Sequence, residues 1–195
     1  MNRKNARFLF GIILVLGIFL VVKGANEWKK TREEESWARN EAVERLKEPL
    51  IEKSSFTQPE FGEMVGMLKI PKIEADLPIV EGTHEDDLRK GVGHYGGTAY
   101  PQENEQIFLS GHRDTVFRRM GELQIGDRIS MAMPYGEFDY EIISTKIVAA
   151  DDLTVITPQK EEVLTISTCY PFSYVGHAPD RYIIYAKPVY EVSNQ

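Results

Sequence analysis

An uninterrupted apolar run near the N-terminus constrains this chain more than any other feature of its sequence. Residues 8–22 read FLFGIILVLGIFLVV and include no polar side chain. A helix over this run has no polar face anywhere, which disfavours the alternative of a core helix in a water-soluble domain. It spans about 22 Å, and the flanking Arg7 and Lys23 can extend their charged ends to the membrane interfaces. We therefore predict a transmembrane anchor over residues 8–23.

The sequence around the run favours a retained anchor over a cleaved signal peptide. A signal peptide needs a small-residue cleavage site after its apolar stretch, whereas Lys23 interrupts the sequence VVKGANEW at 21–28. Basic residues also precede the run, and such flanks stay on the cytoplasmic side of a membrane. We expect residues 1–7 in the cytoplasm and residues 24–195 outside the cell membrane.

Charge and cysteine content exclude several classes of function. The chain has 23 basic and 30 acidic residues, and residues 1–30 hold six of the basic ones and one acidic one. Residues 31–195 therefore carry 17 basic and 29 acidic residues, which is unfavourable for binding nucleic acid. Cys169 is the single cysteine, so the sequence holds neither an intrachain disulfide nor a cysteine-rich zinc site. We predict no metal and no cofactor.

A charged segment separates the anchor from the rest of the chain. Residues 26–52 are rich in Glu, Lys, Arg and Ala, with apolar residues at helical spacing, and Pro49 is expected to end or bend the helix. Residues 54–61, SSFTQPEF, have the composition of a linker. We assign residues 24–62 to a helical tether and linker, and residues 63–195 to a single domain.

That domain has the pattern of a mainly β protein. Short apolar, β-branched runs alternate with turn residues, a rhythm typical of a closed barrel or a sandwich. Candidate strands lie at 64–70, 77–80, 106–110, 128–132, 138–149, 163–168 and 181–187. Candidate short helices or turns lie at 86–93, 115–123 and 151–158, the last with an aspartate cap.

Three chemically active side chains occur at ends of predicted strands. Cys169 follows the run VLTIST, His112 follows QIFLSG, and Arg181 begins RYIIYAK. If the Cys and Arg strands are antiparallel neighbours and the His strand lies parallel to the Cys strand, all three meet at one end of the barrel. A thiol, an imidazole and a guanidinium there would supply a nucleophile, a proton carrier and an anion stabiliser.

Each of these residues also has a structural interpretation. A single cysteine is often a small buried hydrophobe, although an unpaired thiol in an exported domain is unusual. His177 is the main alternative base, since it lies eight residues after Cys169 in the loop before Arg181. His84 is expected to be solvated, and His94 is expected to be a structural residue in a turn.

Four segments together resemble the sortases, the cysteine transpeptidases of Gram-positive cell walls. LTISTC at 164–169 resembles the family's TLxTC signature, and LSGHRDTVF at 109–117 is similar to its histidine segment. GVGHYGGTAYPQEN at 91–104 and the strand RYIIYAK at 181–187 also fit, with departures from the pattern at Tyr100 and Gln102. The resemblance covers roughly residues 64–190, which is nearly all of the predicted domain.

The resemblance implies a fold and a set of catalytic residues. The fold is a closed eight-stranded β-barrel with short helices, here preceded by the transmembrane helix and the charged tether. The implied catalytic residues are Cys169 as nucleophile, His112 as general acid and base, and Arg181 as stabiliser of the oxyanion or substrate. Thr168 and His177 are expected to contact the substrate.

The resemblance also implies an activity and partners. A sortase cleaves a sorting signal such as LPxT-(Gly or Ala) after the Thr and joins the surface protein to an amine of a peptidoglycan precursor. With no second apolar segment after residue 187, the chain most resembles class D, followed by class A. Alternatives are a sortase-fold cysteine peptidase that acts mainly as a hydrolase, and a pilin-polymerising sortase. A non-catalytic membrane adaptor is disfavoured because all three catalytic residue types are present.

Overall fold

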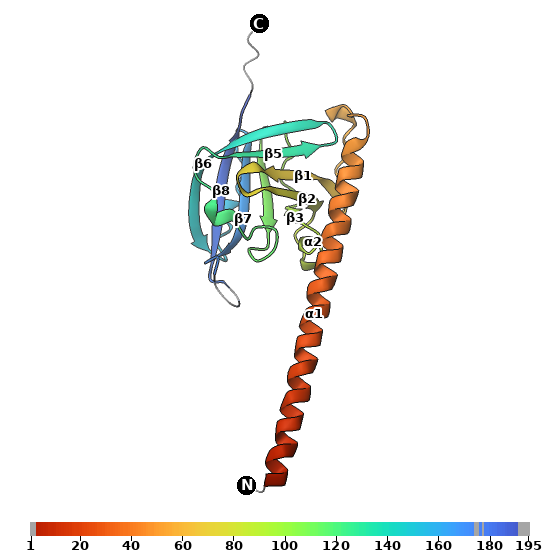
Figure 1. Ribbon diagram of the computed structural model, residues 1–195. Coiled ribbons are helices and arrows are strands. Elements are labelled where there is room, and N and C mark those ends of the chain that lie inside the picture. Colours follow the sequence, from red (N-terminus) through yellow and green to blue (C-terminus); the bar gives the residue numbers. More distant parts are fainter. Residues whose placement is uncertain (1–2, 174–175, 177, 191–195) are drawn as a thin grey trace.

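The structure is a computed structural model that describes residues 3–173, 176 and 178–190. It combines one long N-terminal helix, α1, with a β-barrel (Figure 1). The helices are α1 (Arg3–Lys47) and α2 (Glu85–Leu88), and four 3-10 turns lie at Lys53–Ser55, Pro71–Ile73, Met120–Glu122 and Leu153–Val155. The strands are β1 (Met64–Ile70), β2 (Ala75–Glu81), β3 (Val92–His94), β4 (Gln106–Gly111), β5 (Arg128–Met133), β6 (Gly136–Ala149), β7 (Val163–Tyr170) and β8 (Asp180–Pro188).

The eight strands close into one barrel, which confirms the predicted fold. Their order around the barrel is β1-β2-β3-β4-β7-β8-β6-β5, and β5 pairs with β1 to complete the ring. The pairs β2–β3 and β4–β7 are parallel, and the others are antiparallel. Among the described strands each one pairs with a neighbour on both sides, so the barrel has no edge strand.

Alternation of side chains along the strands builds the core. In β7, Leu164 and Ile166 point into the barrel, where they pack with Leu109 of β4 and Ile184 of β8. The intervening residues of these strands point outward. Because side chains alternate along a strand, Cys169 is on the same outward face as Thr165 and Ser167, and its side chain is directed away from the core.

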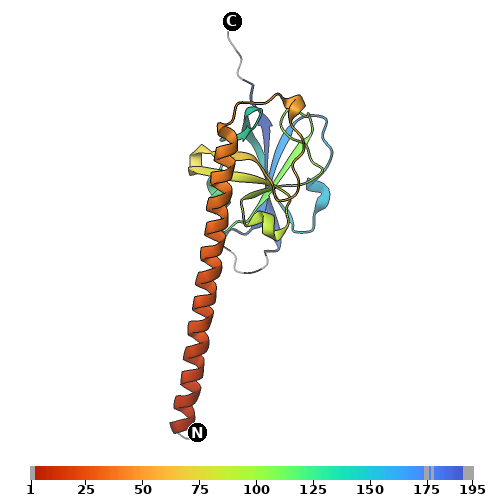
Figure 2. The ribbon, with the colours of Figure 1, turned by 90° about the vertical axis from the view of Figure 1, so that its right-hand side faces the viewer.

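Helix α1 is continuous from the predicted anchor into the predicted tether and ends at Lys47, so residues 48–62 of the assigned tether and linker lie beyond it (Figures 1 and 2). Within the described residues it is the one helix long and apolar enough to cross a membrane, and its apolar window is not buried against the barrel. Phe10 is 78% exposed, which is unfavourable in water but expected in lipid. The helix ends at Lys47, two residues before Pro49, because the ring of a proline is incompatible with a helix interior.

The C-terminal third of α1 packs on the barrel. Ala38 and Ala42 are fully buried against Met64 and Met67 of β1 and Val80 of β2. Small side chains four residues apart lie on one face of a helix, so they allow close approach to the strands. At the two ends of this contact, Arg39 pairs with Asp76 at 3.4 Å and Arg45 Nη1 donates to the carbonyl of Met64 at 3.2 Å.

The seven strands expected from the sequence all occur, and one strand was missed. Strand β3 has three residues and lies in a Gly-rich segment that the sequence analysis assigned to a turn. Its pairing with β2 and β4, rather than its own β-propensity, makes it a strand. His94 is therefore a fully buried strand residue and not a residue of a turn.

Candidate active site

Strand pairing brings Cys169 and Arg181 together. The two are direct cross-strand partners in the antiparallel pair β7–β8, so their Cα atoms are about 5 Å apart. The next partner of Arg181 is Val148 of β6. Cys169 is a free thiol and is partly exposed. It therefore occupies an accessible position at the end of its strand.

His112 reaches the same end of the sheet from the other side of β7. Strands β4 and β7 are parallel, and Gly111 pairs with Thr168. His112 is the next residue after Gly111, as Cys169 is the next after Thr168, so the histidine leaves the sheet beside the cysteine. The order across the sheet is thus His112, Cys169, Arg181. The sequence analysis expected this order if the Cys and Arg strands were antiparallel and the His and Cys strands parallel, and both conditions are met.

The turn after β4 has a specific steric requirement. A Cβ atom on Gly111 would lie 2.5 Å from the ring of Phe117 and 2.9 Å from Val116, so no other residue fits without movement. The backbone N–H of Phe117 donates to the carbonyl of His112 at 3.0 Å, and the Phe117 side chain is fully buried. The position of the His112 backbone is consequently determined by the core.

Two arginines donate hydrogen bonds to backbone carbonyls of the segment between β7 and β8. Arg181 Nη1 donates to the carbonyls of Asp180 at 3.0 Å and Ala178 at 3.3 Å. Arg113, next to His112, donates to the carbonyls of Pro171 at 3.3 Å and Gly176 at 2.9 Å. Arg113 thereby joins the histidine loop to the cysteine loop. Sequence reasoning missed Arg113, whose only signal was its place next to His112.

Aromatic side chains pack beside the three candidate residues. Phe172 lies edge-on to Tyr170 and Tyr182, with ring centroids 5.4 and 5.2 Å apart, and both tyrosines flank the cross-strand pair of Cys169. Thr168 is 2% exposed, and its hydroxyl donates to the carbonyl of Gly111 at 2.8 Å. This bond joins β7 to β4, and the expected contact of Thr168 with the substrate stays a prediction.

The other histidines do not join this cluster within the described residues. His94 is buried between Glu81 Oε2, 2.6 Å from Nδ1, and the carbonyl of Ala99, 3.0 Å from Nε2. His84 is exposed at the start of α2. His177 lies outside the described residues, so its expected role stays a prediction.

The buried Glu81–His94 pair has a third member, Tyr100. The Tyr100 hydroxyl donates to Glu81 Oε2 at 2.7 Å, and its ring stacks on that of His94 at 4.4 Å. Burial and the hydrogen bond to Glu81 raise the pKa of Tyr100, so it remains a neutral donor. Tyr100 is one of the two positions that depart from the family pattern. Its hydrogen bond to Glu81 joins it to the Glu81–His94 pair, and His94 in turn contacts the carbonyl of Ala99 in the segment after β3.

The β6–β7 connection covers part of the outward face shared with Cys169. Val155 packs on Phe108, and its carbonyl accepts a 2.8 Å bond from Gln106 Nε2. Glu105 accepts the backbone N–H groups of Gln159 and Gln106, and these bonds lower the pKa of the Glu105 carboxyl. Among the described residues, no group of three or more His, Cys, Asp or Glu side chains is arranged to hold a metal ion.

Comparison with known proteins identifies the family of the chain. Residues 68–189 match the family described as Sortase domain. The chain is 64% identical to Sortase D of Bacillus subtilis (strain 168) over 138 aligned residues. This alignment covers 70% of this chain and 69% of the relative.

Solved structures show the same likeness. The Clostridium perfringens Sortase D5 transpeptidase superposes with a TM-score of 0.69 at 27% identity, covering 81% of this chain and 99% of that one. The catalytic domain of Bacillus anthracis SrtD superposes with a TM-score of 0.59 at 43% identity, covering 70% of this chain and 94% of that one. The family match, the class D relative and the closed barrel agree: the chain belongs to the sortase family of cysteine transpeptidases, in class D.

Proposed function

We propose that this sortase cleaves an LPxT-(Gly or Ala) sorting signal after the Thr and transfers the protein to an amine of a peptidoglycan precursor. The observation that carries the proposal is the strand register at one end of the barrel. Cys169 and Arg181 are cross-strand partners, and His112 lies one position beyond the parallel pair Gly111–Thr168. The residues proposed as nucleophile, proton carrier and anion stabiliser therefore lie on, or directly after, three neighbouring strands.

In the first half of the reaction, the Cys169 thiol passes its proton to His112, and the resulting thiolate Sγ attacks the carbonyl carbon of the Thr in the signal. Negative charge develops on the carbonyl oxygen, which Arg181 would stabilise. Within the described residues the backbone bonds of its guanidinium use Nη1, so Nε and Nη2 are the donors assigned to this step. The C–N bond then breaks, His112 protonates the departing amine, and a thioester remains on Cys169.

In the second half, the acceptor amine attacks the thioester carbonyl. The amine passes its proton to His112, the C–S bond breaks, and the new amide leaves the enzyme with Cys169 regenerated. The reaction conserves one amide bond and needs no cofactor. Water in place of the amine would give hydrolysis, which is the main alternative outcome.

Helix α1 supports a membrane location for this chemistry. We propose that it anchors the protein with residues 1–7 in the cytoplasm and the barrel outside, since basic residues precede the apolar run. This arrangement would bring the barrel to surface proteins during export and to precursors on the outer face of the membrane.

A peptide panel tests the proposal. The detergent-solubilised full chain is incubated with LPxTG and LPxTA peptides, with or without a diaminopimelate-type amine or glycine, and the products are identified by mass. We expect cleavage after the Thr and a new amide only when the amine is present. Cleavage to the free acid alone, whatever the amine, would instead support the hydrolase. Intact peptides throughout would contradict both.

A further inference from the structure

A groove of about 560 Å³ lies between α1 and the barrel. One wall is the α1 segment after the apolar run, and the other is the turn that follows His112, with the 3-10 turn before β2. Its lining includes Trp28, Arg32 and Glu35 of α1 and Asp114, Arg118 and Arg119 of the segment after β4. The groove is separate from the cross-strand pair of Cys169 and is not used in the proposed reaction.

The groove is basic on an acidic protein. Four of its lining residues are arginines and two are acidic, whereas residues 31–195 as a whole carry 29 acidic and 17 basic residues. Arg119 forms a two-bond pair with Glu122, and Arg39 pairs with Asp76. The remaining two arginines account for most of the positive charge available to a ligand.

Arg32 and Arg118 have only neutral partners among the described residues. The guanidinium of Arg32 lies 4.5 Å above the ring of Trp28. Arg118 donates through Nε and Nη2 to the backbone carbonyl of Asp114, at 3.0 and 2.6 Å. In the described part of the chain neither forms an ion pair with a carboxylate, so each retains its full charge for an anion.

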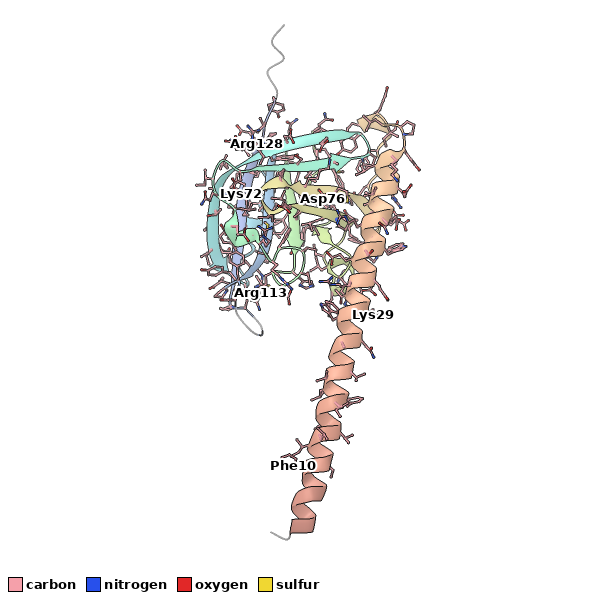
Figure 3. All side chains as sticks on the ribbon, viewed as in Figure 1. Phe10, Lys29, Lys72, Asp76, Arg113 and Arg128 are labelled. Atoms are coloured by element: carbon pink, nitrogen blue, oxygen red, sulfur yellow. The ribbon has the colours of Figure 1, made fainter. Side chains whose placement is uncertain are left out.

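The groove is placed at the level of the membrane surface. The predicted anchor ends at Lys23, whose side chain can extend to the interface, and a hydrocarbon core of about 20 helical residues counted from Phe8 would end near Trp28. The interface therefore lies between Lys23 and Trp28, where the groove begins. Figure 3 shows Arg113, in the turn after β4, near the level of Lys29 on α1, while Arg128 lies at the opposite end of the barrel. This placement follows from α1 and the barrel alone and does not depend on which side of the membrane the barrel occupies.

We propose that this groove binds the phosphate headgroup of an anionic membrane phospholipid through Arg32 and Arg118. Arginine guanidinium groups bind phosphate oxygens by charge-assisted hydrogen bonds, and Trp28 is suited to the interfacial region. One lipid would bridge the tether helix and the turn that carries His112. The bound lipid would hold the Cys169 end of the barrel against the membrane.

Trp28 provides a direct readout. The chain has two tryptophans, so Trp37→Phe leaves Trp28 as the only one. The full chain with this substitution, in uncharged detergent micelles, is titrated with phosphatidylglycerol, with phosphatidylcholine or with inorganic phosphate while Trp28 emission is recorded. We expect a saturable change with phosphatidylglycerol, and none with the other two at the same concentrations.

Variants with equal net charge separate the groove from general attraction. Arg32→Gln/Arg118→Gln should raise the phosphatidylglycerol midpoint about tenfold or more. Arg128→Gln/Lys187→Gln removes the same charge from two surface ion pairs outside the groove and should leave the midpoint within about twofold. Glu35→Gln removes a groove carboxylate and should lower the midpoint, an effect of opposite sign that loss of folding cannot produce.

Several results would overturn the inference. Equal midpoints for the two double variants would mean that the lipid responds to overall charge. An equal response to phosphatidylcholine would remove the requirement for an anion, and an equal response to inorganic phosphate would replace the lipid by a soluble anion. Each readout is independent of peptide cleavage, so the proposed function can fail while this inference holds, and the reverse.

Discussion

Cys169 and Arg181 are directly opposed across the antiparallel pair β7–β8, although eleven residues separate them along the chain. The pairing fixes their separation through backbone hydrogen bonds, so the loop between them can vary without altering it. On the other side of Cys169, the parallel strand β4 ends one residue before His112. On the other side of Arg181, its partner on β6 is the apolar residue Val148. The cysteine therefore lies in the middle of a row of candidate reactive groups.

Replacing the nucleophile is the first test of the proposed chemistry. Cys169→Ala should abolish peptide cleavage and amine transfer, because no other thiol is present. Cys169→Ser should be nearly as inactive, since a hydroxyl is much less acidic than a thiol. The measurement is product formation by mass, with circular dichroism to verify the fold. Substantial turnover by the alanine variant would refute the mechanism.

The choice between two histidines is the second test. We predict that His112→Ala lowers kcat/KM for a fluorogenic LPxTx peptide by about 10²-fold or more, as expected for loss of a general acid and base. His177→Ala should retain most of the rate, and the exposed His84→Ala serves as a control. An active His112→Ala beside an inactive His177→Ala would assign the role to His177 instead.

Arg181 should be sensitive even to a conservative change. Arg181→Ala is expected to lose activity on the scale of His112→Ala. Arg181→Lys should recover only part, because an ammonium cannot both bind the carbonyls of Ala178 and Asp180 and present further donors in a fixed plane. The assay is kcat/KM for the same peptide. Full activity of the lysine variant would show that charge alone suffices.

The buried network around Glu81 should contribute to stability. Tyr100→Phe removes a 2.7 Å bond to Glu81 Oε2, and bonds to charged groups contribute about 1.5–3 kcal/mol. Thermal unfolding of the full chain, followed by near-ultraviolet circular dichroism, should show a lower midpoint. Tyr95→Phe is the matched control, since Tyr95 is 41% exposed. Similar midpoints for the two variants would mean that the hydroxyl of Tyr100 adds nothing.

The Glu105 carboxylate predicts a dependence of stability on pH. Its pKa is lowered by bonds from the backbone N–H groups of Gln159 and Gln106, so the charged form stabilises the folded state above the usual glutamate pKa of about 4.3. That contribution is lost as the pH falls through the lowered value. Glu105→Gln should therefore unfold at a lower temperature than the unmodified chain at pH 7, and the difference should shrink with increasing acidity.

A second glutamate provides the control for this pH series. Glu60 is exposed, and its carboxylate forms no hydrogen bond or ion pair within the described residues. Glu60→Gln should leave the thermal midpoint nearly unchanged at every pH. A Glu105→Gln difference that persists unchanged into acid would show that the carboxylate charge is not the cause.

Local sequence patterns predicted the long apolar N-terminal helix, seven of the eight strands and the three candidate catalytic residues. These depend on local properties: an apolar run without a polar face, alternation with a period of two, and reactive residues where strands meet turns. The family resemblance supplied the eight-stranded closure, which the pattern alone left open between a barrel and a sandwich.

Which residues become neighbours depends on long-range contacts that no local pattern predicts. Strand β3 depends on pairing with β2 and β4, and the partners of His94 are provided by segments distant from it. The docking of α1 through Ala38 and Ala42, and hence the groove beside it, has no local signal either. An alanine in a charged segment favours a helix but does not show which surface the helix will contact. Such features arise from long-range packing, where the free energy depends on which surfaces meet and not on any single segment.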